Sequence, residues 1–207
     1  MRCVIVCGGE IKNYVRIKSF FRNDDYFIFC DRGLLHREKL GVKPDLAVGD
    51  FDSCEKPSDV REIIALPKEK DDTDSVFAVK EGIKRGFDEF LIIGALGGRA
   101  DHSLCNLAML KMLYGRKKKA FIADDYSTIR VVGQETVKIS DDCKYFSVIN
   151  LFGNAENINI KNAKYPLENG NIPTDWQYGV SNEVEKGRCA EVSAEKGEIL
   201  LITVDRE

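Results

Sequence analysis

The feature that most constrains the fold is a series of short apolar runs in the first 125 residues, each closely followed by glycine, proline or aspartate. These runs lack polar alternation, which is typical of strands buried on both faces of a parallel sheet. We therefore expect strands at 3–7, 26–30, 46–49, 63–66, 90–94 and 120–123.

Two stretches between these runs have helical periodicity. Residues 75–85 place apolar side chains near a 3.6-residue period, and Thr73 or Asp74 can cap that helix. Residues 103–114 form an apolar helical band that Gly115 can end. Strands alternating with such helices predict a doubly wound α/β domain, Rossmann-like and three-layered, with a mainly parallel sheet.

The pattern changes after about residue 125. Short β-type runs replace the helical stretches, and turn residues at 153–154, 168–171 and 195–197 separate them. We interpret residues 1–125 as an α/β domain and 126–207 as a small all-β sandwich domain. The β-type runs lie at 128–132, 136–139, 146–152 and 199–204.

Composition excludes several classes of protein. The 31 basic and 34 acidic residues give a net charge of −3, which provides no basic face for nucleic acid. A hydrophobic content of 43% is too high for a disordered chain. The apolar run at 3–7 is too short for a secretory signal or a membrane-spanning helix, so we expect neither.

The seven cysteines are scattered, with no CxxC pair, and there are only two histidines. This pattern argues against a structural zinc site and a disulfide framework. Buried reduced thiols are consistent with a cytoplasmic protein.

Carboxylates recur where the predicted strands end. In an open α/β sheet, ligands bind outside the carboxyl ends of the strands. Asp50 and Asp52 are two residues apart, so in an extended chain both project to the same side. Asp31, Asp71 and Asp74 should lie at the same edge, where oxygen ligands suit Mg²⁺ shared with substrate phosphates. Aspartate is also a common turn and cap residue, which is the alternative reading.

The segment 97–102, Gly-Gly-Arg-Ala-Asp-His, joins a predicted strand to a predicted helix. Glycines allow close backbone approach, the helix N-terminus attracts phosphate, and Arg99 offers a bidentate fork. A glycine turn is also routine between strand and helix. The chain has neither a Walker-type phosphate loop nor a GxGxxG dinucleotide motif.

Histidine and aromatic residues provide weaker signals. His102 fits either a substrate contact or a helix cap, and His36 is expected on the surface because its neighbours are polar. Trp176 and Tyr178 can stack on an aromatic ligand or simply pack.

Together these motifs resemble those of the thiamine pyrophosphokinases. Residues 44–53, Pro-Asp-Leu-Ala-Val-Gly-Asp-Phe-Asp-Ser, are similar to the central motif of that family. The next two motifs are matched in order by 70–74 and 94–102, and Asn106 follows. Near the C-terminus, 164–167 and 179–183 resemble motifs of the β domain.

The resemblance implies transfer of the diphosphate group of ATP to the hydroxyl of thiamine, giving thiamine diphosphate and AMP. It implies an ATP- and Mg²⁺-binding catalytic domain at 1–125, a thiamine-binding sandwich at 126–207, and a homodimer with shared active sites. The implied metal ligands are Asp50, Asp52 and Asp74. The implied ATP- and phosphate-binding residues are Asp31, Thr73, Gly98, Arg99 and Asn106. The implied thiamine-binding residues are Asp101, His102, Trp176, Ser181 and Asn182, and the implied catalytic residues are Asp71, Arg99 and Asp101.

The sequence departs from the family pattern at one position, and two alternative functions are also compatible with parts of it. Arg32 stands where many members of the family have glycine. A phosphohydrolase with Asp50 as nucleophile and Asp52 as acid–base partner fits the paired aspartates alone. A nucleotide- or thiamine-binding regulator without turnover is the non-enzymatic alternative.

Overall fold

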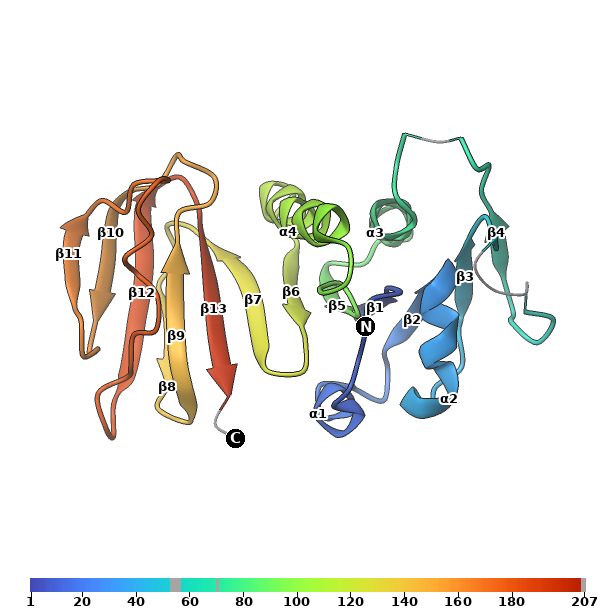
Figure 1. The fold of residues 1–207 in the computed structure, drawn as a ribbon, viewed down its shortest axis with the longest axis horizontal. Coiled ribbons are helices and arrows are strands. Elements are labelled where there is room, and N and C mark those ends of the chain that lie inside the picture. The colour runs from blue at the N-terminus through green and yellow to red at the C-terminus, as the bar shows by residue number, and fades with distance from the viewer. Residues whose placement is uncertain (53–56, 70, 206–207) are drawn as a thin grey trace. The chain divides into compact units, whose positions relative to one another are not determined.

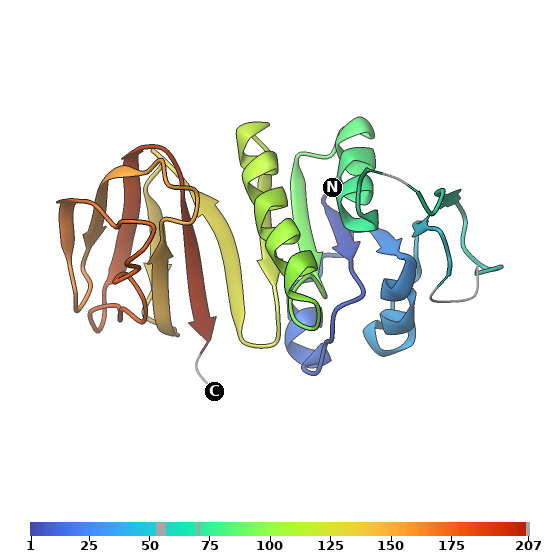
Figure 2. The same cartoon turned by 45° about the horizontal axis from the view of Figure 1, so that its top comes forward.

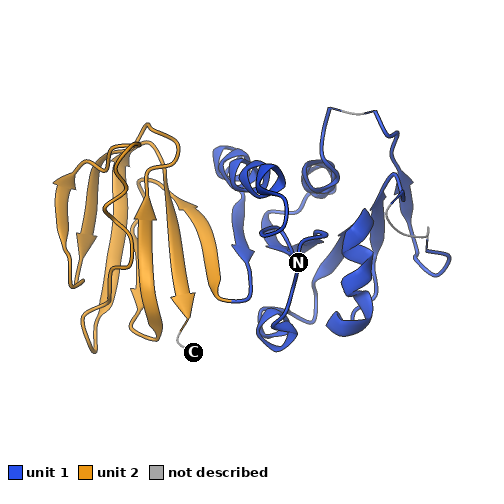
Figure 3. Cartoon of the chain, in the orientation of Figure 1, with its two compact units in different colours: residues 1–125 blue, residues 126–207 orange. Residues whose placement is uncertain are grey.

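The computed structural model describes residues 1–52, 57–69 and 71–205 (Figure 1). Ser53 and Lys70, which belong to two of the predicted motifs, lie outside the described residues. The chain divides into two compact units, residues 1–125 and 126–207 (Figure 3), and each is considered by itself below.

Unit 1 contains a six-stranded parallel sheet, in the order β4-β3-β2-β1-β5-β6. All four residues of β1, the strand between β2 and β5, are buried, and its neighbours bury their apolar residues against the helices. The parallel sheet predicted from the apolar runs is therefore confirmed. The strands are β1 (Cys3–Val6), β2 (Tyr26–Cys30), β3 (Leu46–Gly49), β4 (Ile63–Ala65), β5 (Glu89–Ile93) and β6 (Lys119–Ala123).

Helices cover both faces of this sheet, as predicted (Figures 1 and 2). On one face lie α3 (Asp74–Lys84) and α4 (Ala100–Gly115), close to the ranges expected from periodicity. On the other lie α1 (Tyr14–Ser19), a 3₁₀ helix η1 (Asp31–His36) and α2 (Arg37–Leu40). These three helices are not evident from the sequence pattern, because elements of four to six residues are too short to show periodicity.

Unit 2 is a β-sandwich, as predicted. One sheet has the order β7-β13-β9 and the other β11-β10-β12-β8, and every strand pairing within them is antiparallel. Apolar residues of both sheets share one buried core. The strands are β7 (Ser127–Val132), β8 (Val137–Ser140), β9 (Cys143–Ile149), β10 (Glu156–Lys161), β11 (Leu167–Gly170), β12 (Cys189–Lys196) and β13 (Ile199–Asp205).

Two sequence interpretations in unit 2 are wrong. Residues 168–171 were expected to form a turn, but most of them belong to β11, which pairs with β10 through an irregular register. The run 146–152 leaves its sheet after Ile149. The strands β10 and β12 were not predicted. Their buried residues alternate with asparagine, glutamate and lysine, which are uncommon in strands.

None of the helices in the described part of the chain is long and apolar enough to cross a membrane.

A buried ion pair anchors the start of the parallel sheet. Arg2, directly before β1, contacts both carboxylate oxygens of Asp25 at 3.0 and 2.7 Å and also donates to the carbonyl oxygen of Phe20 at 2.6 Å. The side chains of Arg2 and Asp25 are 3% and 0% exposed. The pair thus ties β1 to the end of α1 and the start of β2.

Replacing one partner leaves the other charge buried. We expect Asp25→Asn to lower the free energy of unfolding by about 3–5 kcal/mol, measured by urea denaturation. Asp24→Asn is a matched control, because Asp24 is exposed beside the chain's amino group, and should change stability by less than about 0.5 kcal/mol. Equal urea midpoints for the two variants would contradict this role of Asp25.

Candidate functional site

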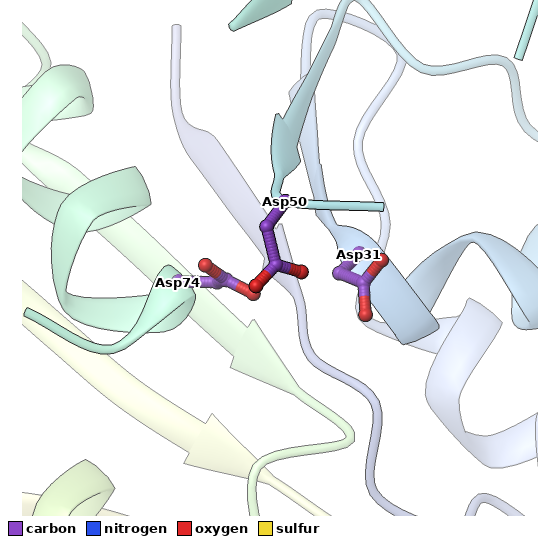
Figure 4. Close-up of side chains that lie close together, drawn as sticks. All are labelled: Asp31, Asp50 and Asp74. Atoms are coloured by element: carbon purple, nitrogen blue, oxygen red, sulfur yellow. The ribbon is translucent and has the colours of Figure 1, made fainter. Parts of the chain in front are cut away.

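Three aspartates meet at the carboxyl ends of the parallel strands. Asp31 follows β2, Asp50 follows β3, and Asp74 is the first residue of α3. One carboxylate oxygen from each lies within 4.8 Å of the other two (Figure 4). Asp31 is buried, whereas Asp50 and Asp74 are half-buried, so the cluster is accessible from one side.

Strand pairing and a glycine bring Asp31 and Asp50 together. Cys30 pairs with Val48, so the residues after them sit at the same level of the edge. A Cβ atom at Gly49 would come within 2.7 Å of the Cβ of Asp31, so this approach requires glycine. Asp31 itself adopts a positive φ of 20°, which residues other than glycine rarely adopt. The surrounding packing must hold this conformation.

Helix capping and a buried hydrogen-bond chain place Asp74. The Thr73 hydroxyl accepts from the amide of Val76 and caps α3, as predicted. The Cys30 thiol lies 3.7 Å from the carbonyl oxygen of Asp74, which links α3 to the end of β2. Ser75 donates to the side-chain oxygen of Asn106 at 2.8 Å, and the amide of Asn106 donates to Ala95 at 2.7 Å.

The structure does not bring Asp52 and Asp71 into this three-aspartate cluster. The assumption that 50–52 is extended is wrong, because Phe51 has a φ of 55° and turns the chain. The Asp52 side chain is 48% exposed and lies 4.0 Å from the Lys68 amine. Asp71 is exposed. Their roles at the site stay predictions.

The chemistry of the donor set fits a hard divalent cation. Carboxylates at this spacing repel one another by about 3 kcal/mol per pair near a protein surface, which a cation would relieve. Two oxygens bound to one Mg²⁺ can be at most about 4.2 Å apart, twice the bond length. The upper limit of 4.8 Å in the cluster is close to that value. Mg²⁺ usually keeps open positions for water and substrate phosphates.

A second group of residues lies after β5. Gly97 and Gly98 are exposed, with φ of 85° and 65°, and they lead into the N-terminus of α4. Arg99 is the N-cap residue but does not cap the helix with its side chain. Its guanidinium instead forms a two-point contact with Asp101, at 3.1 and 2.5 Å. This segment has the glycines, helix N-terminus and arginine that phosphate binding needs.

The pairing of Arg99 with Asp101 affects which group can accept a proton. The guanidinium of Arg99 lowers the pKa of Asp101 to about 2. A carboxylate with so low a pKa is a weak base at neutral pH, because an effective base has its pKa near the operating pH. His102 is exposed beside this pair, and its amide donates to Asp101.

His36 is not on the surface, contrary to the sequence prediction. It is 9% exposed, and its Nε2 lies 2.8 Å from the carbonyl oxygen of Gly9. The hydroxyl of Tyr14 lies 2.7 Å from Nδ1. Because a carbonyl only accepts, Nε2 carries the proton and Nδ1 accepts from Tyr14. The polar neighbours that suggested exposure belong to η1 and α2, whose inner face packs against the turn after β1.

Of the residues in unit 2 that the sequence predicts to bind thiamine, one is buried and two are exposed. Asn182 is 4% exposed, and its side chain accepts from the amides of Tyr165 and Glu183 and donates to the carbonyl oxygen of Tyr165. The Asn182 side chain therefore holds its own loop against the loop that contains Tyr165. Ser181 has a φ of 59° and is exposed, and Trp176 is 69% exposed beside Tyr178.

A small pocket of about 100 Å³ lies beside these residues. It is smaller than the pockets of roughly 300–1,000 Å³ that enclose organic ligands. Its lining residues come from β10, the two C-terminal motifs and the segment between those motifs: Ile160, Tyr165, Pro166, Leu167, Ile172, Tyr178, Gly179, Val180 and Asn182.

Comparison with protein families identifies both units. Residues 17–122 match the family model of the thiamin pyrophosphokinase catalytic domain. Residues 134–199 match the model of the thiamin pyrophosphokinase vitamin B1 binding domain. The chain belongs to the thiamin pyrophosphokinase family. The resemblance drawn from the motifs is thereby confirmed.

Individual members of the thiamin pyrophosphokinase family are similar along their whole length. Thiamine pyrophosphokinase of Bacillus subtilis is 27% identical over 211 residues, covering 98% of each chain. The solved structure of a thiamin pyrophosphokinase family protein from Enterococcus faecalis has a TM-score of 0.82 at 28% identity, with full coverage of both chains. The Bacillus subtilis structure has a TM-score of 0.86 at 24% identity and supports the fold.

The activity of the chain is transfer of the diphosphate group of ATP to thiamine, as the thiamin pyrophosphokinase family assignment shows. The two alternatives, a phosphohydrolase and a regulator without turnover, find no support in these matches.

The buried His36 predicts a pH dependence of stability. Burial lowers the pKa of His36 below its ordinary value of 6.5. As the pH falls through 6.5, the unfolded chain takes up this proton before the folded chain does, so the free energy of unfolding decreases. Between pH 7 and pH 5.5, we expect His36→Gln to lose less stability than the unsubstituted protein, measured by urea denaturation.

His102→Gln is the matched control for this experiment, because His102 is exposed. It should keep the pH dependence of the unsubstituted protein. Parallel stability curves for the His36→Gln variant and the unsubstituted protein would exclude His36 as the source.

Proposed function

We propose that diphosphate transfer from ATP to thiamine takes place at the carboxyl edge of the parallel sheet, with Asp31, Asp50 and Asp74 holding Mg²⁺. The observation that carries this proposal is the convergence of these three carboxylates within 4.8 Å. Bound there, the ion would neutralise charge on the phosphate oxygens of ATP. The backbone amide of Asp52 donates to the carboxylate of Asp50 at 3.3 Å, so Asp52 adjoins the cluster. Its side chain is proposed to take part through a water molecule.

The glycine turn and the start of α4 are proposed to hold the phosphates. Gly98 leaves the backbone open, and Arg99 can exchange its exposed partner Asp101 for a phosphate. Asn106 is buried and bonded to Ser75 and Ala95, so it supports this turn rather than touching the nucleotide. Thr73 has a similar supporting role as the cap of α3.

The chemical step is an in-line displacement. The thiamine hydroxyl oxygen forms a bond to the β-phosphorus of ATP, the bond from that phosphorus to the bridging oxygen breaks, and AMP leaves. A carboxylate accepts the hydroxyl proton. Asp71 and Asp101 are the two candidates, and Asp101 becomes the stronger base when Arg99 turns to phosphate, because the pairing lowers its pKa.

Thiamine recognition is proposed to involve both units. Asp101 and His102 from unit 1, and Trp176 and the segment of Ser181 and Asn182 from unit 2, are the proposed contacts. The exposed indole of Trp176 suits stacking on an aromatic ring, and Asn182 holds the neighbouring backbone. The positive thiazolium ring also suits an edge rich in carboxylates.

We propose a homodimer with shared active sites. Two features of unit 2 support it: the pocket beside the two C-terminal motifs, of about 100 Å³, is too small for thiamine, and apolar side chains around that pocket are exposed. These side chains are Tyr165, Trp176, Tyr178 and Val180. The free cysteines among the described residues are consistent with the proposed cytoplasmic location.

The proposal is tested by thiamine-dependent AMP formation with ATP and Mg²⁺. We expect Asp31→Asn, Asp50→Asn and Asp74→Asn each to lower kcat/KM at least about 100-fold, because each removes a charged ligand. Asp52→Asn should lower it about 10-fold, since its carboxylate lies outside the cluster.

Asp88→Asn serves as the control, because Asp88 pairs with Lys118 before β5, at the opposite edge of the sheet. Its activity should stay within about twofold of the unsubstituted protein. Full activity of Asp50→Asn or Asp74→Asn would refute the metal site. Phosphate release without thiamine would refute the proposed reaction.

The dimer proposal predicts the mass of the protein in solution. Analytical ultracentrifugation should give about twice the chain mass of 23.3 kDa. The double substitution Trp176→Ser and Val180→Ser should shift the protein toward the single-chain mass, because it removes exposed apolar contacts. A single-chain mass for the unsubstituted protein at the concentrations of the assay would contradict a shared site.

A further inference from the structure

Arg32 is an exposed cation at the edge of the sheet that holds the three-aspartate cluster. It follows Asp31 directly in η1. Among the described residues, its guanidinium has neither an ion-pair partner nor a side-chain hydrogen bond. Most other arginines of unit 1 are paired, for example Arg22 with Glu89 and Arg37 with Asp59.

A close contact fixes the direction of the Arg32 stem. A Cβ atom at Gly8 would lie 2.7 Å from the Cβ and 3.2 Å from the Cγ of Arg32, so the stem lies directly on the turn after β1. Two further contacts hold η1 on this turn. Gly33 packs against the carbonyl oxygen of Val6, and His36 bonds to the carbonyl oxygen of Gly9.

The end of β1 lies between the two halves of the proposed site. The order β3-β2-β1-β5 places the three-aspartate cluster over β2 and β3 and the glycine turn after β5. The ends of β2 and β5 are two strand spacings apart, about 10 Å. A chain of phosphates that reaches from the cluster to Gly98 and Arg99 therefore passes the end of β1, where Arg32 lies.

Charge balance also favours a cation here. The cluster contributes three negative charges, and ATP adds about four more, whereas one Mg²⁺ supplies only two positive charges. Arg99 is already paired with Asp101. Arg32 can therefore bind phosphate without first giving up a protein partner.

We propose that Arg32 binds the polyphosphate of ATP where it crosses the end of β1. The inference rests on the proposed function and adds a phosphate-binding residue to the site. A guanidinium can hold two phosphate oxygens at once, whereas an ammonium acts as a point charge. Gly8 is required at this position because any side chain would displace the Arg32 stem.

The test is binding of α,β-methylene-ATP with Mg²⁺, measured by calorimetry in the absence of thiamine. This analogue cannot transfer its diphosphate group, so the measurement does not depend on turnover. We expect Arg32→Gln to raise its Kd about tenfold and Arg32→Lys about threefold. In the assay, the KM for ATP should rise likewise, with the KM for thiamine unchanged.

Arg61→Gln is the matched control. It removes the same charge from an exposed arginine that precedes β4, at the opposite edge of the sheet. Its Kd for the analogue should stay within about twofold. If Arg61→Gln and Arg32→Gln raise the Kd equally, the loss of affinity comes from the lower net charge of the protein, and the proposal is wrong.

A second measurement separates contact with phosphate from an indirect effect on Asp31. Mn²⁺ binding without nucleotide should be unchanged in Arg32→Gln. If Mn²⁺ affinity falls as much as analogue affinity, Arg32 acts by positioning Asp31, and the proposal is wrong. An unsubstituted protein that binds the analogue yet forms no AMP would refute the proposed function alone, leaving the Arg32 comparison valid.

Discussion

The arrangement of the edge depends on the close packing of Gly49 against Asp31. Parallel pairing of β2 with β3 brings the two strand ends to one level, but a side chain at position 49 would separate them. Asp31 has a positive φ, which is uncommon outside glycine although aspartate adopts it more readily than most residues. The contacts of η1 with the turn after β1 hold the backbone in this state. The packing of the sheet and the position of the proposed metal ligands therefore both depend on Gly49.

The sequence predicts the layers well, because apolar runs and helical periodicity report directly on burial. The same patterns say little about elements as short as η1, whose stability comes from contacts made by Gly33 and His36 in the folded protein. His36 illustrates the point. Its neighbours in sequence are polar, while its neighbours in space are Tyr14 and Gly9.

The candidate site was predictable in part. The places of Asp31, Asp50 and Asp74 follow from strand ends and a helix start, features visible in the sequence. The separation of Asp52 from the cluster depends on the φ angle of Phe51. Phenylalanine seldom has a positive φ, so no sequence rule indicates the turn at Phe51. The pairing of Arg99 with Asp101 is likewise a matter of side-chain geometry.

The buried link from Ser75 through Asn106 to Ala95 joins the first turn of α3 and the second turn of α4 to the loop after β5. Buried hydrogen bonds therefore connect the residue after the proposed metal ligand Asp74 with the segment that leads into the proposed phosphate turn. Because their relative position is set during folding, nucleotide binding does not have to order one against the other. The conformational entropy lost on binding is correspondingly small, and more of the interaction energy is expressed as affinity.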